Sequence, residues 1–348
     1  MTHTRRPART PQRTRSARRF SLKARTAARC AAVAATLATA LGTATLTAPA
    51  AHAADAGLPA APYLYLGWGN PPDPVQLMND TGAKAFTLAF LNSDGGCNAA
   101  WDGQRALTGG TDSDAIAKIR DAGGDVVPSV GGWNGTKLGD VCGSADELAA
   151  AYGKIVDGLN LKAIDLDIEN TEIDNNASQD KILGAVKSLK QSHPDVQVIA
   201  TIGTTATGPT EQGKRLITQA KEVGAGVDTW TIMPFDFGAG SGDMGDASIK
   251  ASDALHALLK DTFGKSDAET YKMQGISSMN GTTDQSETVT TDDFNQMLDY
   301  ANSHHIGRFT YWAVNRDRPC PGGGAQQACS GIDQQEWAFT KIVAQYEG

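Results

Sequence analysis

The chain has 348 residues, and its charge is unevenly distributed: the first 54 residues hold ten Lys or Arg and no acidic residue, whereas the remainder holds 21 basic and 39 acidic residues. A formal charge of −18 on that remainder argues against nucleic acid or an anionic membrane as a partner. Neutral sugars remain compatible, and we expect no cofactor.

The basic N-terminal segment has the pattern of an export signal. An Ala/Thr/Leu run follows the basic residues and ends in Ala51-His52-Ala53, which predicts a signal peptide over 1–53 and a secreted protein. The run is too short and too rich in Thr for a membrane span. Residues 18–23 form an imperfect twin-arginine pattern, so the export route stays open. The alternative is a disordered basic tail that binds nucleic acid.

After a short Ala-rich lead over 54–61, apolar runs rich in β-branched residues alternate with amphipathic windows. The runs predict eight strands: Tyr63–Gly69, Ala85–Ser93, Asp125–Gly132, Ala163–Glu169, Val196–Gly203, Asp228–Asp236, Tyr271–Asn280 and Gly307–Arg316. The windows between them predict helices that include Asp114–Ala122, Ala145–Leu159, Gln179–Ser192 and Thr291–His304, with Ser144 and Thr290 as capping residues.

Strict strand–helix alternation implies a parallel sheet, and eight units in about 290 residues fit a closed barrel better than an open sheet. The alternative is a doubly wound dinucleotide-binding fold. The turn after the first strand, Gly67-Trp68-Gly69-Asn70-Pro71-Pro72, lacks the glycine-rich phosphate pattern of that fold. The predicted fold is therefore α/β, a (β/α)8 TIM barrel in a single domain over 62–348.

Four of the five cysteines lie outside the predicted signal peptide, and an even number suggests two disulfides in an exported protein. Three pairings are possible. We favour Cys97–Cys142 and Cys320–Cys329, because the members of each pair lie in neighbouring loops of the predicted layout. A metal site is the alternative, but no Cys-x-x-Cys or paired His accompanies these positions.

The fourth predicted strand carries three acidic residues at every second position, Asp165, Asp167 and Glu169. Period-two alternation sends them to one face of the strand and the aliphatic residues to the other. Because the aliphatic face must meet the helices, the carboxylates point into the barrel, with Glu169 at its C-terminal mouth. Three carboxylates so close cannot all ionise at low cost, so at least one should hold or share a proton.

Such a protonated carboxyl is what acid catalysis at neutral pH requires. Two other interpretations stay open. One is a solvated strand face, which a barrel strand does not have. The other is a Ca²⁺ or Mg²⁺ site, for which no Asp-x-Asp-x-Asp-Gly loop supplies further ligands. We expect no metal.

The motif Asp165-x-Asp167-x-Glu169 resembles the strand-four motif of glycoside hydrolase family 18, the chitinases, and Ser129-Val130-Gly131-Gly132 is similar to the family's strand-three motif. Met233-Pro234-Phe235-Asp236 is similar to its strand-six segment, and Trp312 matches its strand-eight tryptophan. The resemblance covers the chain from Tyr63 to Tyr346 and is closest to the compact bacterial subgroup that lacks an inserted α+β domain.

The resemblance implies retaining hydrolysis of β-1,4 bonds between N-acetylglucosamine units, in which the substrate's own acetamide replaces an enzyme nucleophile. Glu169 would protonate the leaving oxygen and later deprotonate water. Asp167 would orient the acetamide and stabilise the oxazolinium ion, while Asp165 shares a proton with it. Ser129, Gly131 and Gly132 would support this cluster from behind.

Several further residues are candidates for substrate binding. Trp312 would form the floor beneath the sugar, and Met233, Phe235 and Asp236 would line the opposite wall; the alternative for Asp236 is a helix N-cap. Trp68, Trp101 and Trp133 also follow barrel strands and are candidate sugar platforms, although such tryptophans also fix loops to the rim.

Two features depart from the family pattern or limit it. Lys162-Ala163 replaces the usual acidic start of the strand-four motif, and Phe235 stands where many members have a tyrosine that helps to hold the acetamide. Only 26 residues separate Asn280 from Gly307, too few for an inserted domain, so we expect an open cleft and endo cleavage of chitin or chito-oligosaccharides by a monomer. Alternatives are an endo-β-N-acetylglucosaminidase, a non-catalytic lectin and a metal-dependent hydrolase.

Overall fold

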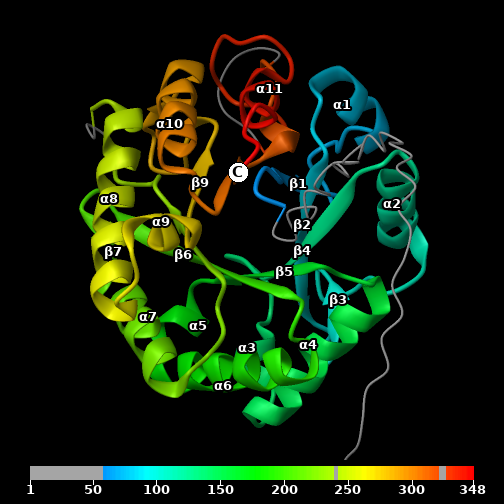
Figure 1. The fold of residues 1–348 in the computed structure, drawn as a ribbon. Helices are drawn as coiled ribbons and strands as arrows, with labels where there is room; N and C mark the ends of the chain where they lie inside the picture. Colours follow the sequence, from blue (N-terminus) through cyan, green and yellow to red (C-terminus); the bar gives the residue numbers. More distant parts are fainter. Residues whose placement is uncertain (1–57, 239–241, 321–326) are drawn as a thin grey trace, which may run out of the picture. The chain divides into compact units, whose positions relative to one another are not determined.

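The structure is a computed structural model that describes residues 58–238, 242–320 and 327–348, so the predicted signal peptide over 1–53 lies outside the described residues. Eight strands pair in parallel, each with the next of the eight along the chain (Figure 1). They are β1 (Tyr63–Tyr65), β2 (Ala85–Ser93), β4 (Asp125–Gly131), β5 (Ala163–Ile168), β6 (Gln197–Thr205), β8 (Thr229–Met233), β9 (Gln274–Met279) and β12 (Arg308–Trp312). The predicted parallel barrel is confirmed.

Some predicted strand ends were wrong. Residues 271–273 do not begin β9, because Ser266 and Glu269 form a capping box that starts the short helix α9 (Asp267–Lys272). Beyond Trp312 the chain forms a 3-10 turn, η1 (Val314–Arg316), rather than more strand. Apolar runs in the sequence predict where a strand lies. They do not show the local helix caps and turns that set its ends.

Helices surround the strands and connect them (Figure 1). They are α1 (Pro74–Thr81), α2 (Gly110–Asp121), α3 (Leu138–Val141), α4 (Ala145–Leu159), α5 (Thr171–Asp174), α6 (Asn176–Ser192), α7 (Glu211–Val223), α8 (Met244–Phe263), α10 (Thr291–His304) and α11 (Ala338–Val343). The side chains of Ser144 and Thr290 accept hydrogen bonds from the first turns of α4 and α10, as predicted. The remaining strands, β3 (Ala99–Trp101), β7 (Gly208–Pro209), β10 (Gly281–Thr282) and β11 (Thr288–Val289), are short.

The segment before β1 helps to close the barrel. Phe309 of β12 donates its backbone N–H to the carbonyl of Pro59 at 2.8 Å, and the hydroxyls of Thr87 and Thr310 both donate to the carbonyl of Ala61 at 2.6 Å. Because Thr87 lies on β2 and Thr310 on β12, residues 59–61 bridge two strands on either side of β1. Residues 59–61 are therefore part of the barrel base.

The barrel interior is layered by polarity. A small apolar cluster, Ala61, Ala85, Val127, Ala163 and Ile199, fills one layer. Beyond it lie fully buried hydroxyl side chains from several strands, Thr87, Ser129, Thr201, Thr231 and Thr310, together with the fully buried guanidinium of Arg308. Polar groups so deeply buried need internal partners. This interior is built to hold charge.

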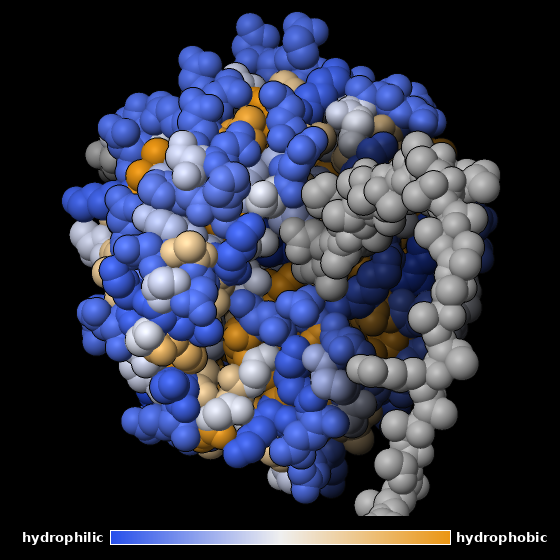
Figure 2. Space-filling model, in the orientation of Figure 1, coloured by the Kyte–Doolittle hydropathy of each residue, from blue (hydrophilic) through white to orange (hydrophobic). Residues whose placement is uncertain are grey.

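A larger apolar core lies between the strands and the helices and includes Ile164, Leu166 and Ile168 of β5. On the face drawn in Figure 2, hydrophilic residues cover most of the surface and hydrophobic residues show near its middle. No helix among the described residues is long and apolar enough to cross a membrane.

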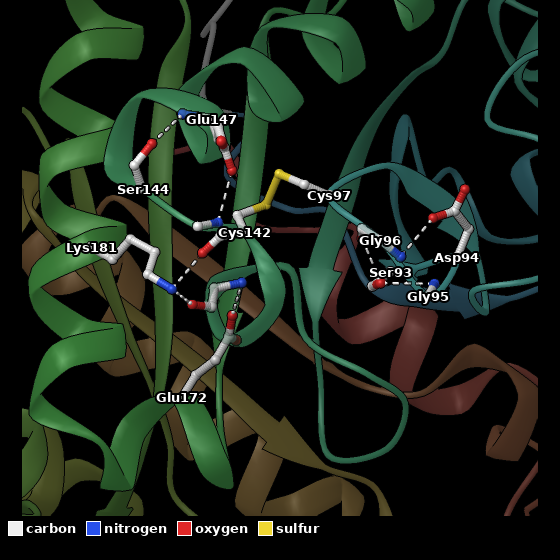
Figure 3. The surroundings of a disulfide bond; sticks show 12 residues. Ser93, Asp94, Gly95, Gly96, Cys97, Cys142, Ser144, Glu147, Glu172 and Lys181 are labelled. Carbon is white, nitrogen blue, oxygen red and sulfur yellow. Dashed lines mark hydrogen bonds between the residues drawn. A yellow bond between two sulfur atoms is a disulfide. The ribbon is translucent and has the colours of Figure 1, made fainter.

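Both predicted disulfides are present. Cys97–Cys142 joins the turn after β2 to the end of α3 (Figure 3), and Cys320–Cys329 closes a loop after η1. Around the first bridge, Lys181 of α6 donates to the carbonyls of Gly139 and Cys142, at 2.8 and 2.6 Å. The short helix α3 is thus fixed by a covalent bond on one side and a lysine on the other.

Candidate active site

A cavity of about 310 Å³ opens at the C-terminal mouth of the barrel. It is lined by Tyr63, Tyr65, Trp68, Phe90, Asn92, Asp102, Trp133, Asn134, Gly135, Asp167, Glu169, Met233, Phe235, Asp236, Ser277, Met279, Asp284, Trp312 and Gln327. Aromatic rings and carboxylates dominate this lining. Enzymes with this fold carry their chemistry at the same mouth.

The acids of β5 point into the barrel as alternation predicts. Asp165 is fully buried and accepts three hydrogen bonds from hydroxyls: from Tyr63 at 2.8 Å, from Ser129 at 2.6 Å and from Thr201 at 2.6 Å. These donors come from β1, β4 and β6. Three O–H donors from three different strands hold the Asp165 carboxyl rigidly at the base of the cluster.

Asp167 is held much less tightly than Asp165. It is 3% exposed, and its Oδ1 has no hydrogen-bond partner among the described residues. Burial, and then the charges of Glu169 and Asp165, raise the pKa of the Asp167 carboxyl well above its usual range. A buried carboxyl with a free oxygen is poised to bind a donor brought by a ligand.

Glu169 follows β5 and faces the cavity. Burial raises the pKa of its carboxyl to about 7; the charges of Asp236 and Asp165 act in the same direction, and Lys137 opposes them. A carboxylic acid that keeps its proton near neutral pH can act as a general acid. The expectation that the three acids cannot all ionise agrees with this electrostatic pattern.

The two glycines at the end of β4, Gly131 and Gly132, allow close backbone contact with the acids. Gly131 has φ +113°, and a Cβ there would lie 2.2 Å from the Asp167 carbonyl. Gly132 has φ +80°, and a Cβ there would lie within 3 Å of the Phe90 ring. Its N–H donates to the Asp167 carbonyl at 2.9 Å. A side chain at Gly131 would push β4 away from β5, and one at Gly132 would collide with Phe90 of β2.

Aromatic rings form the floor of the cavity. Trp312, at the end of β12, stacks on Phe90 of β2 with ring centroids 5.4 Å apart and an interplanar angle of 16°. Tyr63 packs edge-on against the same indole at 5.9 Å. The remaining surface of Trp312 is available to the cavity, and an indole can pack against the C–H face of a pyranose.

Of the three other tryptophans predicted as sugar platforms, two lie at the rim of the cavity and one does not. Trp68 is 45% exposed and packs edge-on against Tyr65, and Trp133 is 63% exposed. Trp101, however, is fully buried in the core and donates its indole N–H to the Leu107 carbonyl. The prediction that Trp101 is a sugar platform was therefore wrong: β3 turns it inward, away from the mouth.

A second wall of the cavity is formed by the end of β8, which only β6 separates from β5, and by the residues after β8. Met233, Phe235 and Asp236 all line the cavity. Asp236 has φ +58° and accepts a hydrogen bond from the backbone N–H of Gln285 at 3.0 Å. Partial burial raises the pKa of its carboxyl. Asp243, not Asp236, caps α8, so the helix-cap alternative for Asp236 is wrong.

Sequence reasoning missed several residues of the site. Tyr63 and Thr201 could have been found, because each is a hydroxyl residue at an inward position of a buried strand. Asn92 of β2 lines the cavity at 4% exposure, with its Oδ1 unpartnered among the described residues. Lys137 and Glu172 are also buried near the acids. Nothing in the local sequence marks these last two.

One alternative for the acids of β5 was a metal site, which would need further ligands close by. Among residues 58–238, 242–320 and 327–348, no group of three or more His, Cys, Asp or Glu is arranged to hold a metal ion.

The chain is similar to known proteins. It is 30% identical over 306 residues to a probable bifunctional chitinase/lysozyme of Escherichia coli, covering 82% of this chain and 34% of the relative, and 31% identical over 277 residues to endochitinase 11 of Metarhizium anisopliae, covering 74% and 52%. The chain thus spans about a third and a half of these two relatives. No protein-family model matches the chain.

Among solved structures, the catalytic domain of a hyperthermophilic chitinase from Pyrococcus furiosus superposes with a TM-score of 0.75 at 28% identity, covering 82% of this chain and 93% of that domain. The barrel, the inward acids of β5 and these similarities agree. The chain is thus related in sequence to chitinases and has the fold of a family 18 glycoside hydrolase.

Proposed function

We propose that the protein is a chitinase, which hydrolyses β-1,4 bonds between N-acetylglucosamine units with Glu169 as the general acid. Asp165, Asp167 and Glu169 form a row of inward-pointing acids, which we call the acid ladder. One observation carries the proposal: the carboxyl of Glu169, with a pKa of about 7, lies at the mouth end of this ladder, in a cavity whose floor is formed by stacked aromatic rings. The relatives named above are chitinases by description.

Glu169 would donate its proton to the glycosidic oxygen as the bond breaks and then take a proton from the attacking water. Family 18 uses the substrate's acetamide in place of an enzyme nucleophile. Here the free Oδ1 of Asp167 is the acceptor for the acetamide N–H. Such a bond would turn the acetamide oxygen toward the anomeric carbon and stabilise the positive charge of the oxazolinium ion.

Asp165 has a supporting role in this scheme, in which it would share a proton with Asp167. Its two oxygens are occupied by the hydroxyls of Tyr63, Ser129 and Thr201. A carboxyl so held forms a rigid base beneath Asp167, and its charge acts with burial to raise the pKa of Asp167 and of Glu169.

Trp312 would support the sugar whose bond is cleaved, and Trp68 and Trp133 would support sugars along the rim. Met233, Phe235 and Asp236 would contact the acetamide group from the β8 wall. Phe235 supplies no hydroxyl there, so Asp236 is the polar group of that wall nearest the end of β8. We propose that the enzyme is secreted. We also propose endo action, since the exposed Trp68 and Trp133 suit an open groove.

Product analysis tests the proposal. The enzyme is incubated with colloidal chitin, with chitotetraose and with an N-glycopeptide, beside Glu169→Gln as the matched control. Hydrolysis of chitotetraose and early release of mixed-length oligomers from chitin are expected. Cleavage of the glycopeptide alone would indicate an endo-β-N-acetylglucosaminidase, and dimer as the sole early product would contradict endo action.

A further inference from the structure

Lys137 is a buried cation in the segment between β4 and α3, where it is 2% exposed. Its ammonium group donates to the backbone carbonyl of Gly132 and, at 2.6 Å, to that of Asn134. These two carbonyls lie on either side of Trp133, whose indole is 63% exposed at the rim of the cavity. Lys137 therefore holds the turn that presents Trp133.

The same turn is bonded to the end of the acid strand. The N–H of Gly132 donates to the carbonyl of Asp167 at 2.9 Å, and the side-chain amide of Asn170 donates to the carbonyl of Trp133 at 3.3 Å. Asn170 directly follows Glu169. A displacement of the turn would thus be transmitted to both functional carboxyls.

The charge of Lys137 faces acids from every element packed around it. They are Glu172 of α5, Asp167 and Glu169 at the end of β5, and Asp140 of α3. Burial lowers the pKa of Lys137, whereas each of these acids raises it. In return, the cation lowers the pKa of Asp167, of Glu169 and of Glu172, in each case against a larger effect of burial.

Glu172 has its own fixed partner, since its Oε1 accepts from the backbone N–H of Gly139 at 2.8 Å. Lys137 is therefore shared among the buried acids and is not reserved for Glu172. The positive charge of Lys137, joined at Glu172 by that of Lys181, limits how strongly burial can favour the neutral forms of these acids.

We propose that Lys137 is a positioning residue that couples the sugar platform of Trp133 to the acid ladder, by holding the turn at residues 132–134 and by placing one positive charge beside Asp167 and Glu169. The proposal rests on the proposed function, because it assigns Glu169 a proton to donate. It predicts two separable effects of substitution, one on sugar binding and one on the titration of Glu169.

Three substitutions separate these effects. Lys137→Met removes the charge and the donor, Lys137→Gln keeps a donor without the charge, and Lys137→Arg keeps both. The matched control is Lys181→Met, because Lys181 also donates to two backbone carbonyls, those of Gly139 and Cys142, but does not contact the Trp133 turn.

The first readout is the titration of Glu169, followed by ¹³C NMR of labelled carboxyls and assigned with Glu169→Gln. Removal of a neighbouring positive charge should raise its midpoint by about one pH unit in Lys137→Met and Lys137→Gln. Lys137→Arg and Lys181→Met should leave the midpoint in place. Because this readout needs no substrate, it is informative even if the substrate proposed above is wrong.

The second readout is kinetic, with chitotetraose as substrate. Lys137→Met should move the alkaline limb of kcat/KM to higher pH and raise KM severalfold, whereas Lys137→Gln should move the limb with a smaller rise in KM. An unchanged Glu169 midpoint in both neutral variants would overturn the proposal. If Lys137→Met does not fold, as judged by circular dichroism, Lys137→Gln carries the test. An inactive wild type would instead contradict the proposed function.

Discussion

The two walls of the cavity hold their carboxylates very differently. On the β5 wall, Asp165 is fully buried and fixed by three hydroxyls at 2.6 to 2.8 Å. On the β8 wall, Asp236 lies in a loop after β8, is only partly buried, and accepts a hydrogen bond from the backbone of Gln285 at 3.0 Å. Regular strands therefore position the acid chemistry, while loops provide the contacts that adapt to a substrate.

This difference between the walls predicts how substitutions on each of them should affect activity. Residues on β5 and its neighbours are constrained by one another, so a substitution there should affect the chemical step. Residues on the β8 wall have fewer fixed partners, and substitutions there should affect substrate fit by smaller factors. The following predictions test this contrast, from the largest expected effect to the smallest.

Glu169→Gln should have the largest effect. The amide cannot donate a proton to the leaving oxygen, so kcat on chitotetraose should fall by about 100-fold to 10,000-fold. Reducing-end assays of the variant and the wild type measure this fall in kcat, with circular dichroism as the control for folding. Activity within threefold of the wild type would contradict the assignment of the β5 wall.

Asp167→Asn should be next. The amide keeps the size of the side chain but loses the negative charge that would stabilise the oxazolinium ion, so kcat should fall by about 100-fold to 1,000-fold. Steady-state kinetics on chitotetraose separate kcat from KM. A change confined to KM would show that Asp167 only binds substrate.

Thr201→Val tests the support beneath the ladder. The substitution removes a hydroxyl that donates to Asp165 at 2.6 Å and nearly preserves the shape of the side chain. Loss of one hydrogen bond to a buried charge should lower unfolding free energy by about 1 to 3 kcal/mol. Urea unfolding measures this cost, and a variant as stable as the wild type would show that Asp165 does not depend on the hydroxyl.

Phe235→Tyr tests the β8 wall. A hydroxyl that reaches the acetamide would add one hydrogen bond, which should raise kcat/KM by about two- to tenfold. Kinetics on chitotetraose beside chitobiose show whether the gain depends on subsites. A large loss would mean that the wall has no room for the hydroxyl and is packed as tightly as β5.

The smallest effect on activity is expected from Glu172→Gln, which tests stability. Burial raises the pKa of Glu172 to about 7 from an ordinary 4.5, so the folded state binds more protons than the unfolded state between these values. Stability should therefore fall as pH rises from about 4.5 to 7.

Glu172→Gln should remove part of that dependence, on the order of 1 to 3 kcal/mol between pH 5 and pH 8. Melting temperatures across this range measure it, and Glu169 retains its own share of the slope. The same pH dependence in variant and wild type would show that Glu172 does not titrate in this range.

The sequence allowed the barrel and the β5 wall to be predicted because both follow from short periodic patterns. Alternation alone directed Asp165, Asp167 and Glu169 inward, and the positions of the loops indicated both cysteine pairs. By contrast, Tyr63 reaches Asp165 across 102 positions of the chain, and no local pattern records such a contact.

The remaining errors have physical causes as well. Trp101 follows a strand, as Trp133 does, but only the three-dimensional course of β3 shows that one is buried and the other exposed. Lys137 was missed because a lysine in a loop is usually solvated, whereas here two backbone carbonyls and a set of buried acids retain it.

The central claim is that Glu169 donates a proton to the leaving oxygen. The most direct test is whether the loss of activity in Glu169→Gln depends on the leaving group. The measurement compares Glu169→Gln with the wild type on chitotetraose and on a dinitrophenyl chitobioside, whose leaving group needs no proton. The account predicts a loss of about 100-fold or more on chitotetraose and a much smaller loss on the activated substrate. Equal losses on both would contradict it, because a residue that only shapes the cavity would affect both substrates alike.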